Sequence, residues 1–209
     1  MSESNGSSVA AIAKRHFNEV QEIAGAIDLS VLDEIVTCLR NARLRGAMVY
    51  VMGNGGSAAT ASHMATDIGK NTSIPGKDPI KIISLGDNLP WVTALSNDEG
   101  YDKVFSGQLD NFLSEGDVVI AISASGNSTN ILNAVELANA RDATTIGIVG
   151  FDGGALAEAV DLSLHAPSTI GSYGPSEDVH MMVQHIITEC LKELQAPLTK
   201  VQEIGRTKL

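Results

Sequence analysis

Five short apolar runs, each separated from the next by helix-forming sequence, constrain the fold of this chain more than any other feature. The runs lie at 47–52, 80–84, 117–123, 145–150 and 161–166, and helical patterns occupy 57–70, 88–96, 102–113, 127–140 and 153–159. A continuous apolar run suits a strand that is buried on both faces of a sheet. Because strands that alternate with helices form parallel βαβ units, we predict an α/β protein with a five-stranded parallel sheet covered by helices on both faces.

Two further helical segments precede the first strand. Apolar residues from Val9 to Ala24 recur at helical spacing, and a second segment begins near Ser30, a candidate N-cap with Asp33 three residues later. We expect a helical hairpin over 9–45. Such an arm either folds back on its own domain or packs against a neighbouring subunit.

The last helix is expected from about Ser176 to Leu194, because Pro197 cannot continue it. No internal linker is visible. We therefore predict a disordered N-terminus over 1–8, a single domain over 9–195 and a C-terminal tail over 196–209.

The composition narrows the class of protein. Hydrophobic residues make up 44% of the chain and aromatic residues only 4%, so the core must consist mainly of Ala, Val, Ile and Leu. The formal net charge of −11 and the absence of a basic stretch argue against a nucleic-acid partner. Cys38 and Cys190 lie in helical stretches, and no signal peptide or membrane span is visible, so we expect a cytoplasmic protein without a membrane partner.

Two loops rich in Gly and Ser follow the first and third predicted strands. They read GNGGS at 53–57 and SASGNS at 123–128, and each opens a helix. Because the carboxyl ends of parallel strands meet at one edge of a sheet, we expect the two loops to lie close together. Helix N-termini and hydroxyls attract anions, so the loops predict a phosphate site, although one serine alone would be ordinary capping.

Neither loop matches a nucleotide-binding motif. GNGGSA follows a strand, but no acidic residue ends the next strand where a ribose would need one. The lysine of a P-loop is also absent. We therefore expect no nucleotide cofactor.

Ionisable side chains stand on two of the predicted helices. His63 and Asp67 are four residues apart and share one face, either over a ligand or as a surface pair. The last helix carries Glu177, His180 and His185 among apolar residues, where a histidine can also be a core residue. Carboxylate and imidazole together can transfer protons at carbon or bind Zn²⁺.

Four segments in order resemble the SIS (sugar isomerase) domain proteins: GNGGSAATASH, SNDEGYDKVF, GDVVIAISASGNSTNIL and EDVHMMVQH. Within that family the chain looks most like the phosphoheptose isomerases, over about 9–195. The resemblance implies a doubly wound, flavodoxin-like three-layer sandwich that assembles as a homotetramer with active sites at subunit interfaces. It also implies conversion of sedoheptulose 7-phosphate to D-glycero-D-manno-heptose 7-phosphate through an enediol.

The resemblance further implies roles for individual residues. Asp67 and His185 would form the catalytic pair, in an order of acid and base that the sequence leaves open. A Zn²⁺ ion, where present, would be held by His63, Asp67, Glu177 and His185. The sugar phosphate would be bound by Asn54, Gly55, Gly56, Ser57, Asp98, Ser123, Ala124, Ser125, Ser128 and Glu177.

The chain departs from the family pattern at three positions. Asp67 replaces a catalytic Glu, Glu177 replaces a Gln, and the basic residue that follows the first helix has only Lys70, one position away. The two acidic changes would either hold a cation more firmly or indicate a different sugar. Two other functions stay open: a non-catalytic oligomer that binds a replication initiator, and a sugar-phosphate sensor.

Overall fold

The computed structural model describes residues 8–73 and 75–194. The expected N-terminal segment and C-terminal tail lie outside the described residues, except for Ser8, whose hydroxyl accepts a hydrogen bond from the Ala11 N–H at 3.2 Å and caps the first helix. None of the described helices combines the length and hydrophobicity needed to cross a bilayer.

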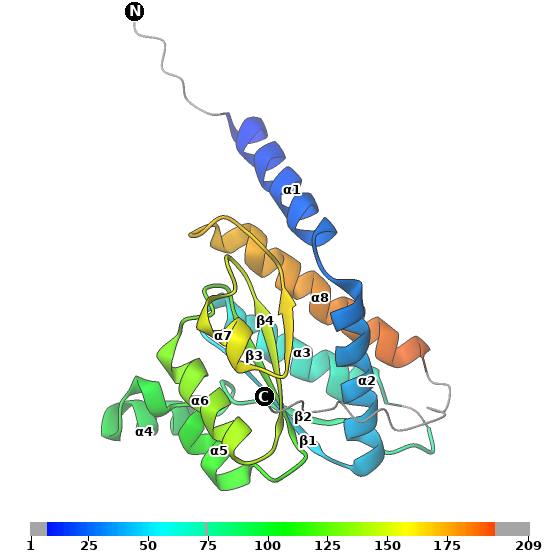
Figure 1. Ribbon diagram of the computed structural model, residues 1–209, viewed down its shortest axis with the longest axis vertical. Coiled ribbons are helices and arrows are strands. Elements are labelled where there is room, and N and C mark those ends of the chain that lie inside the picture. The colour runs from blue at the N-terminus through cyan, green and yellow to red at the C-terminus, as the bar shows by residue number, and fades with distance from the viewer. Residues whose placement is uncertain (1–7, 74, 195–209) are drawn as a thin grey trace, which may run out of the picture.

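The sheet has five parallel strands in the order β2-β1-β3-β4-β5 (Figure 1). The chain therefore runs from β1 outward to β2 and then returns past β1 to β3, so the strand order reverses between β1 and β3. This confirms the predicted doubly wound α/β fold. The strands are β1 Met48–Gly53, β2 Lys81–Ser84, β3 Val118–Ser123, β4 Thr144–Val149 and β5 Leu162–His165.

Helices cover both faces of the sheet. Successive residues of a strand point to opposite faces, so an apolar strand has side chains to bury on each side. In β1, Val49 and Val51 pack with α2, α3 and α8, whereas Tyr50 and Met52 pack with α4 to α7. The helices are α1 Val9–Gly25, α2 Leu29–Arg45, α3 Gly56–Thr66, α4 Leu89–Asp98, α5 Ser106–Phe112, α6 Thr129–Ala140, α7 Gly154–Ala159 and α8 Tyr173–Glu193. A π-helical turn over Asp67–Asn71 continues α3.

The two N-terminal helices follow one another and do not form the expected hairpin. Both pack against α8, and α1 extends beyond the body of the domain (Figure 1). The expected cap of α2 was also wrong: the Asp28 carboxylate accepts the Ser30 N–H at 2.8 Å, so Asp28 is the N-cap. Because Phe17 on α1 is 70% exposed, the arm buries only part of its apolar surface within one chain.

Four buried polar residues lie along one face of α8 at intervals of four. Ser176, His180, Gln184 and Thr188 form this α8 polar stripe, and each has a buried polar atom without a hydrogen-bond partner of good geometry in the described residues. Burial lowers the pKa of His180 to about 4, an effect that the Val149 carbonyl partly offsets. His180 is therefore neutral in the folded protein at physiological pH.

We expect this burial to make the protein sensitive to acid. The pKa of His180 lies below the value of about 6.5 for an unfolded chain, so its contribution is complete above that pH and is lost as the pH falls toward 4. Over this window the contribution is roughly 3 kcal/mol. Denaturant unfolding at several pH values should give a flatter profile for His180→Gln, and an unchanged profile would contradict the assignment.

Candidate active site

The two Gly- and Ser-rich loops line one small cavity at the carboxyl edge of the sheet. They meet there because β1 and β3 are paired, with Gly53 opposite Ile122. We call this the serine cavity. It has a volume of about 130 Å³ and is lined by Asn54, Ser57, Ile122, Ser123, Ala124, Ser125, Ser128, Tyr173 and Glu177.

Two hydrogen bonds hold the second loop in shape. The Ser123 hydroxyl accepts the Gly126 N–H at 3.1 Å, and the Gly126 carbonyl accepts the Leu156 N–H at 2.9 Å. Ser128 is the N-cap residue of α6 but makes no side-chain capping bond, so its hydroxyl stays available for a ligand. Hydroxyls at a helix N-terminus favour an anion in the cavity.

Asn54 supports the first loop through its side chain. Its amide exchanges two hydrogen bonds of 2.9 Å with the Asn130 amide, and it accepts the Tyr101 hydroxyl at 2.8 Å. These contacts tie the first loop to α6. Asp98, by contrast, is exposed at the end of α4 and does not line the serine cavity in this chain.

Glu177 reaches the N-terminus of α3 from α8. A Cβ atom on Gly56 would lie 2.2 Å from its Oε2 atom, so in this position the carboxylate fills the space beside the glycine. A negative group is favourable at a helix N-terminus. Gly55 adopts a φ of +55° immediately before the helix, in the left-handed region that glycine tolerates.

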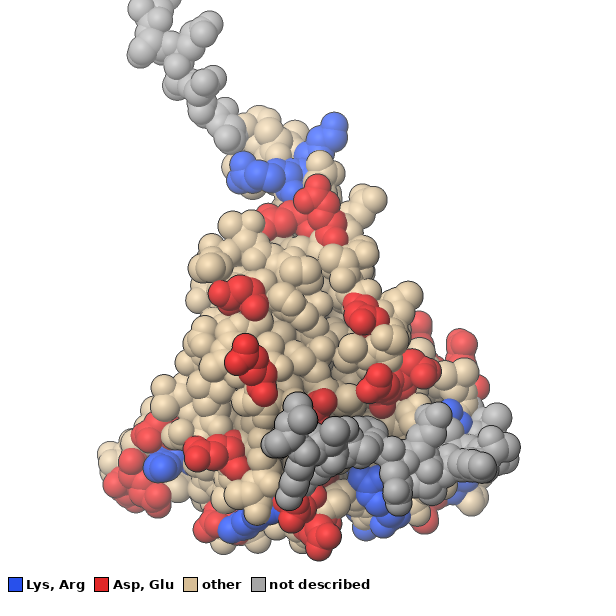
Figure 2. All heavy atoms as spheres, in the orientation of Figure 1, with Lys and Arg blue, Asp and Glu red and all other residues tan. Residues whose placement is uncertain are grey.

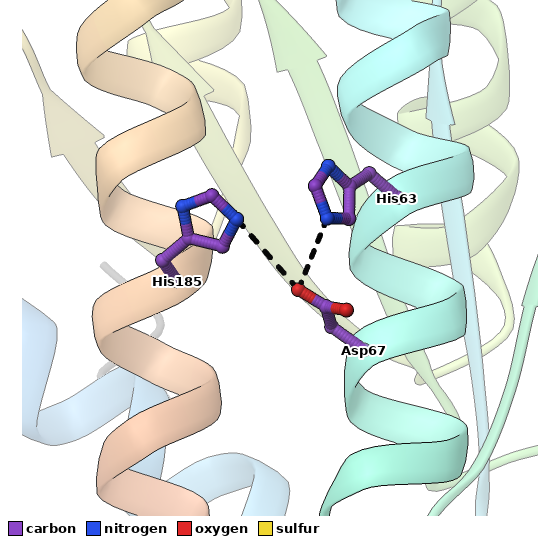
Figure 3. A group of neighbouring side chains, drawn as sticks. All are labelled: His63, Asp67 and His185. Carbon is purple, nitrogen blue, oxygen red and sulfur yellow. Dashed lines mark ion pairs between the residues drawn. The ribbon is translucent and has the colours of Figure 1, made fainter.

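A second cluster combines His63, Asp67 and His185. Asp67 Oδ2 lies 3.2 Å from His63 Nε2 and 3.7 Å from His185 Nε2, and the two imidazole rings meet edge to face (Figure 3). His63 and Asp67 come from α3 and its π-helical extension, whereas His185 comes from α8. The residues implied as the catalytic pair therefore meet across two packed helices.

The cluster fits a divalent metal with one open position. One donor atom from each residue lies within 4.8 Å of the others, and two imidazoles with a carboxylate are a common catalytic zinc set. Glu177, expected as a fourth ligand, is not in the cluster. It lies eight residues before His185, or about 12 Å along α8.

We expect the wild-type protein to bind Zn²⁺ through these three residues. Replacing His63 or His185 with alanine removes a ligand, so Zn²⁺ affinity should fall by more than the roughly 10–100-fold typical of a supporting residue. Competition titration against a chelating dye measures this affinity. His16→Gln is the matched control, because His16 lies on α1 and pairs with Asp178. Equal affinities in all variants would place the metal elsewhere.

Sequence reasoning missed three residues near these sites. Tyr173 lines the serine cavity, and the Asn71 amide donates to Asp67 Oδ1 at 3.1 Å. The Gln184 amide donates to Asp67 Oδ2 at 3.5 Å. The spacing of the α8 polar stripe was a signal for Gln184, because its four polar residues recur at intervals of four in the sequence.

Comparison with known proteins agrees with this fold. A family model described as SIS domain matches residues 11–150. The phosphoheptose isomerase of Geobacter metallireducens is 37% identical over 148 residues, which cover 71% of this chain and 77% of that protein. The phosphoheptose isomerase of Sulfurimonas denitrificans is 36% identical over 181 residues, which cover 86% of this chain and 91% of that protein.

A solved structure gives the same result. The phosphoheptose isomerase of Neisseria gonorrhoeae has 29% identity and a TM-score of 0.76, covering 88% of this chain and 96% of that chain. By fold and by sequence, the chain belongs to the SIS domain family. Within that family it groups with the phosphoheptose isomerases.

Proposed function

We propose that this protein is an aldose–ketose isomerase that converts sedoheptulose 7-phosphate to D-glycero-D-manno-heptose 7-phosphate. Its curated relatives carry the name phosphoheptose isomerase, and the chain covers most of their length. The single observation that carries the proposal is the meeting of Asp67 and His185, from two helices, at 3.7 Å.

In this proposal the serine cavity binds the phosphate group. The hydroxyls of Ser57 and Ser128 and the N-termini of α3 and α6 supply donors and partial positive charge. Glu177 stands beside them as a carboxylate where the family pattern has an amide. It would accept hydrogen bonds from sugar hydroxyls.

The isomerisation needs one proton moved between neighbouring carbons. We assign His185 as the base that takes a proton from C1 of the ketose and returns it to C2. Asp67 transfers protons to and from the oxygens on C1 and C2. The C2 oxygen gains a proton as the enediol forms, and the C1 oxygen loses one as the aldehyde forms. General acid–base catalysis contributes roughly 10²–10⁴-fold to the rate.

His63 completes the arrangement from α3, one turn nearer the start of the helix than Asp67. Asp67 and the two histidines would hold a Zn²⁺ ion, which supplies Lewis-acid polarisation of the sugar oxygens when bound. His63 is 43% exposed and His185 49% exposed, so the open side of the cluster is accessible to a ligand.

We include a homotetramer in the proposal. Ser57 and Asp67 are ten residues apart on one helix, or about 15 Å, so the serine cavity and the histidine cluster of one chain are well separated. In the tetramer the histidine cluster of one subunit would instead face the serine cavity of another. The exposed apolar residues of α1 offer a surface for such assembly: Val9, Ile12 and Phe17. We place the protein in the cytoplasm without a nucleic-acid or membrane partner. On the face shown in Figure 2, acidic side chains are scattered over the body of the domain, whereas basic side chains stand on α1 and along the lower edge.

The proposal is tested by following sedoheptulose 7-phosphate by NMR, with and without added Zn²⁺. Appearance of the aldose product, with solvent deuterium at C2, is the expected result. Ketose phosphates of five and six carbons serve as comparisons for substrate choice. Binding of sugar phosphate without turnover under any metal condition would instead favour a non-catalytic binding protein or sensor.

A further inference from the structure

We propose that Gln184 is a positioning residue that fixes the Asp67 carboxylate for catalysis. This inference rests on the proposed function and deepens it. In the described residues, the side-chain hydrogen bonds of Gln184 go to Asp67 and Met181 and not to the histidine rings. It acts through Asp67, from the buried side of the cluster.

The geometry gives Asp67 two amide donors on opposite sides. Asn71 donates to Oδ1 at 3.1 Å, from the same π-helical turn. Gln184 donates to Oδ2 at 3.5 Å, from α8. Oδ2 is also the oxygen that faces both imidazoles. Gln184 thus connects the helix that carries His185 to the carboxylate that His185 must meet.

The orientation of the Gln184 amide follows from its surroundings. With its oxygen toward Asp67, two oxygen acceptors would face each other without a proton between them, so the nitrogen must point toward the carboxylate. The nitrogen also lies 3.4 Å from the Met181 sulfur, a weak acceptor. Contacts of this length are common in unliganded sites and shorten when a ligand binds.

Stability does not account for an amide at this position. Gln184 is fully buried, and its Oε1 atom has no hydrogen-bond partner in the described residues. A buried acceptor left in this state costs about 1–3 kcal/mol. An apolar side chain of similar volume avoids that cost, so the amide is explained by what it does for Asp67.

Asp67 needs such support for a geometric reason. Its side chain is one methylene shorter than a glutamate, and it must face histidines on two different helices. A rotation about its χ angles would move Oδ2 away from one of them. Two amides on separate oxygens restrict that rotation, in the way that outer groups orient metal ligands.

Gln184→Met is the sharpest test, because it keeps the length of the side chain and removes the donor. We expect kcat to fall by about 10–100-fold with KM within about twofold, and Zn²⁺ affinity to fall by about tenfold. The thermal midpoint should stay the same or rise. A merely structural glutamine would lower the midpoint instead and leave kcat per folded protein unchanged.

Thr188→Val is the matched control on the next turn of the α8 polar stripe. Thr188 is also buried with an unpartnered hydroxyl, but no hydrogen bond links it to Asp67. It should keep wild-type kcat and Zn²⁺ affinity. If Gln184→Met does not fold, Gln184→Asn replaces it, because the shorter amide cannot reach Asp67 and the same losses are expected.

The outcomes separate the two proposals. Wild-type kcat and Zn²⁺ affinity in the Gln184 variants, or equal losses in Thr188→Val, would overturn the positioning role and leave the isomerase intact. A wild-type protein that binds Zn²⁺ but turns over no ketose phosphate would overturn the proposed function. The Zn²⁺ affinities of the variants would then still decide the role of Gln184.

Discussion

Replacing Asp67 with asparagine is expected to lower kcat for isomerisation by about 10²–10⁴-fold, the share that general acid–base catalysis contributes. Asparagine keeps the shape of the side chain but cannot take up or release a proton in the reaction. The serine cavity lies about 15 Å away along α3, so binding of the phosphate group should change little.

Isothermal titration with sedoheptulose 7-phosphate measures binding separately from turnover in this variant. Asp33→Asn is the control, because Asp33 is an exposed carboxylate on α2 that lines neither site. The acid–base assignment requires loss of kcat with retained affinity. Parallel loss of both quantities would show that Asp67 holds the structure together and takes no part in proton transfer.

Gly126→Ala is expected to have a comparably large effect, on binding and folding together. Gly126 has a φ of +63°, and a Cβ atom there would lie 2.0 Å from the Gly153 carbonyl oxygen. The left-handed conformation costs a non-glycine residue about 1–2 kcal/mol, and forced overpacking adds about 1–3 kcal/mol. The second loop must therefore move away from α7, which opens the serine cavity.

Chemical denaturation and a phosphate-binding titration check this variant. We expect at least a tenfold loss of affinity and a fall of about 2–5 kcal/mol in the free energy of unfolding. Gly76→Ala is the matched control, since Gly76 has a φ of +80° but nothing within 4 Å of an added Cβ. Gly76→Ala should lose only the part of the free energy of unfolding that comes from the left-handed backbone. An equal loss of that free energy in both variants would contradict the steric explanation for Gly126.

Local patterns in the sequence predicted the three central strands well because β1, β3 and β4 are buried on both faces. The predicted run 117–123 became β3 Val118–Ser123, and 145–150 became β4 Thr144–Val149. In a half-buried strand apolar and polar residues alternate, but in these runs nearly every residue is apolar. The polar residues at each end therefore mark the limits of the strand. The two serine-rich loops then meet because of strand pairing, which the parallel order implies.

The parts that sequence reasoning got wrong depend on packing between distant segments. Helical periodicity shows which face of α1 is apolar but not that α1 runs along α8 away from α2. The family resemblance implied that Glu177 and His185 hold one metal ion, whereas the axial rise of α8 separates them by about 12 Å. The contact between Gln184 and Asp67 joins residues 117 positions apart, and no local pattern contains that information.

The two apolar layers of the domain allow the two sites to be engineered separately. Both helices that carry the histidine cluster, α3 and α8, pack on one side of the sheet, whereas the loop at 123–128 leads into α6 on the other. A mutant library confined to α4–α7 and that loop would change which ligands the protein accepts. The proton-transfer groups across the sheet would keep their spacing, so new specificities could be selected without rebuilding the reaction centre.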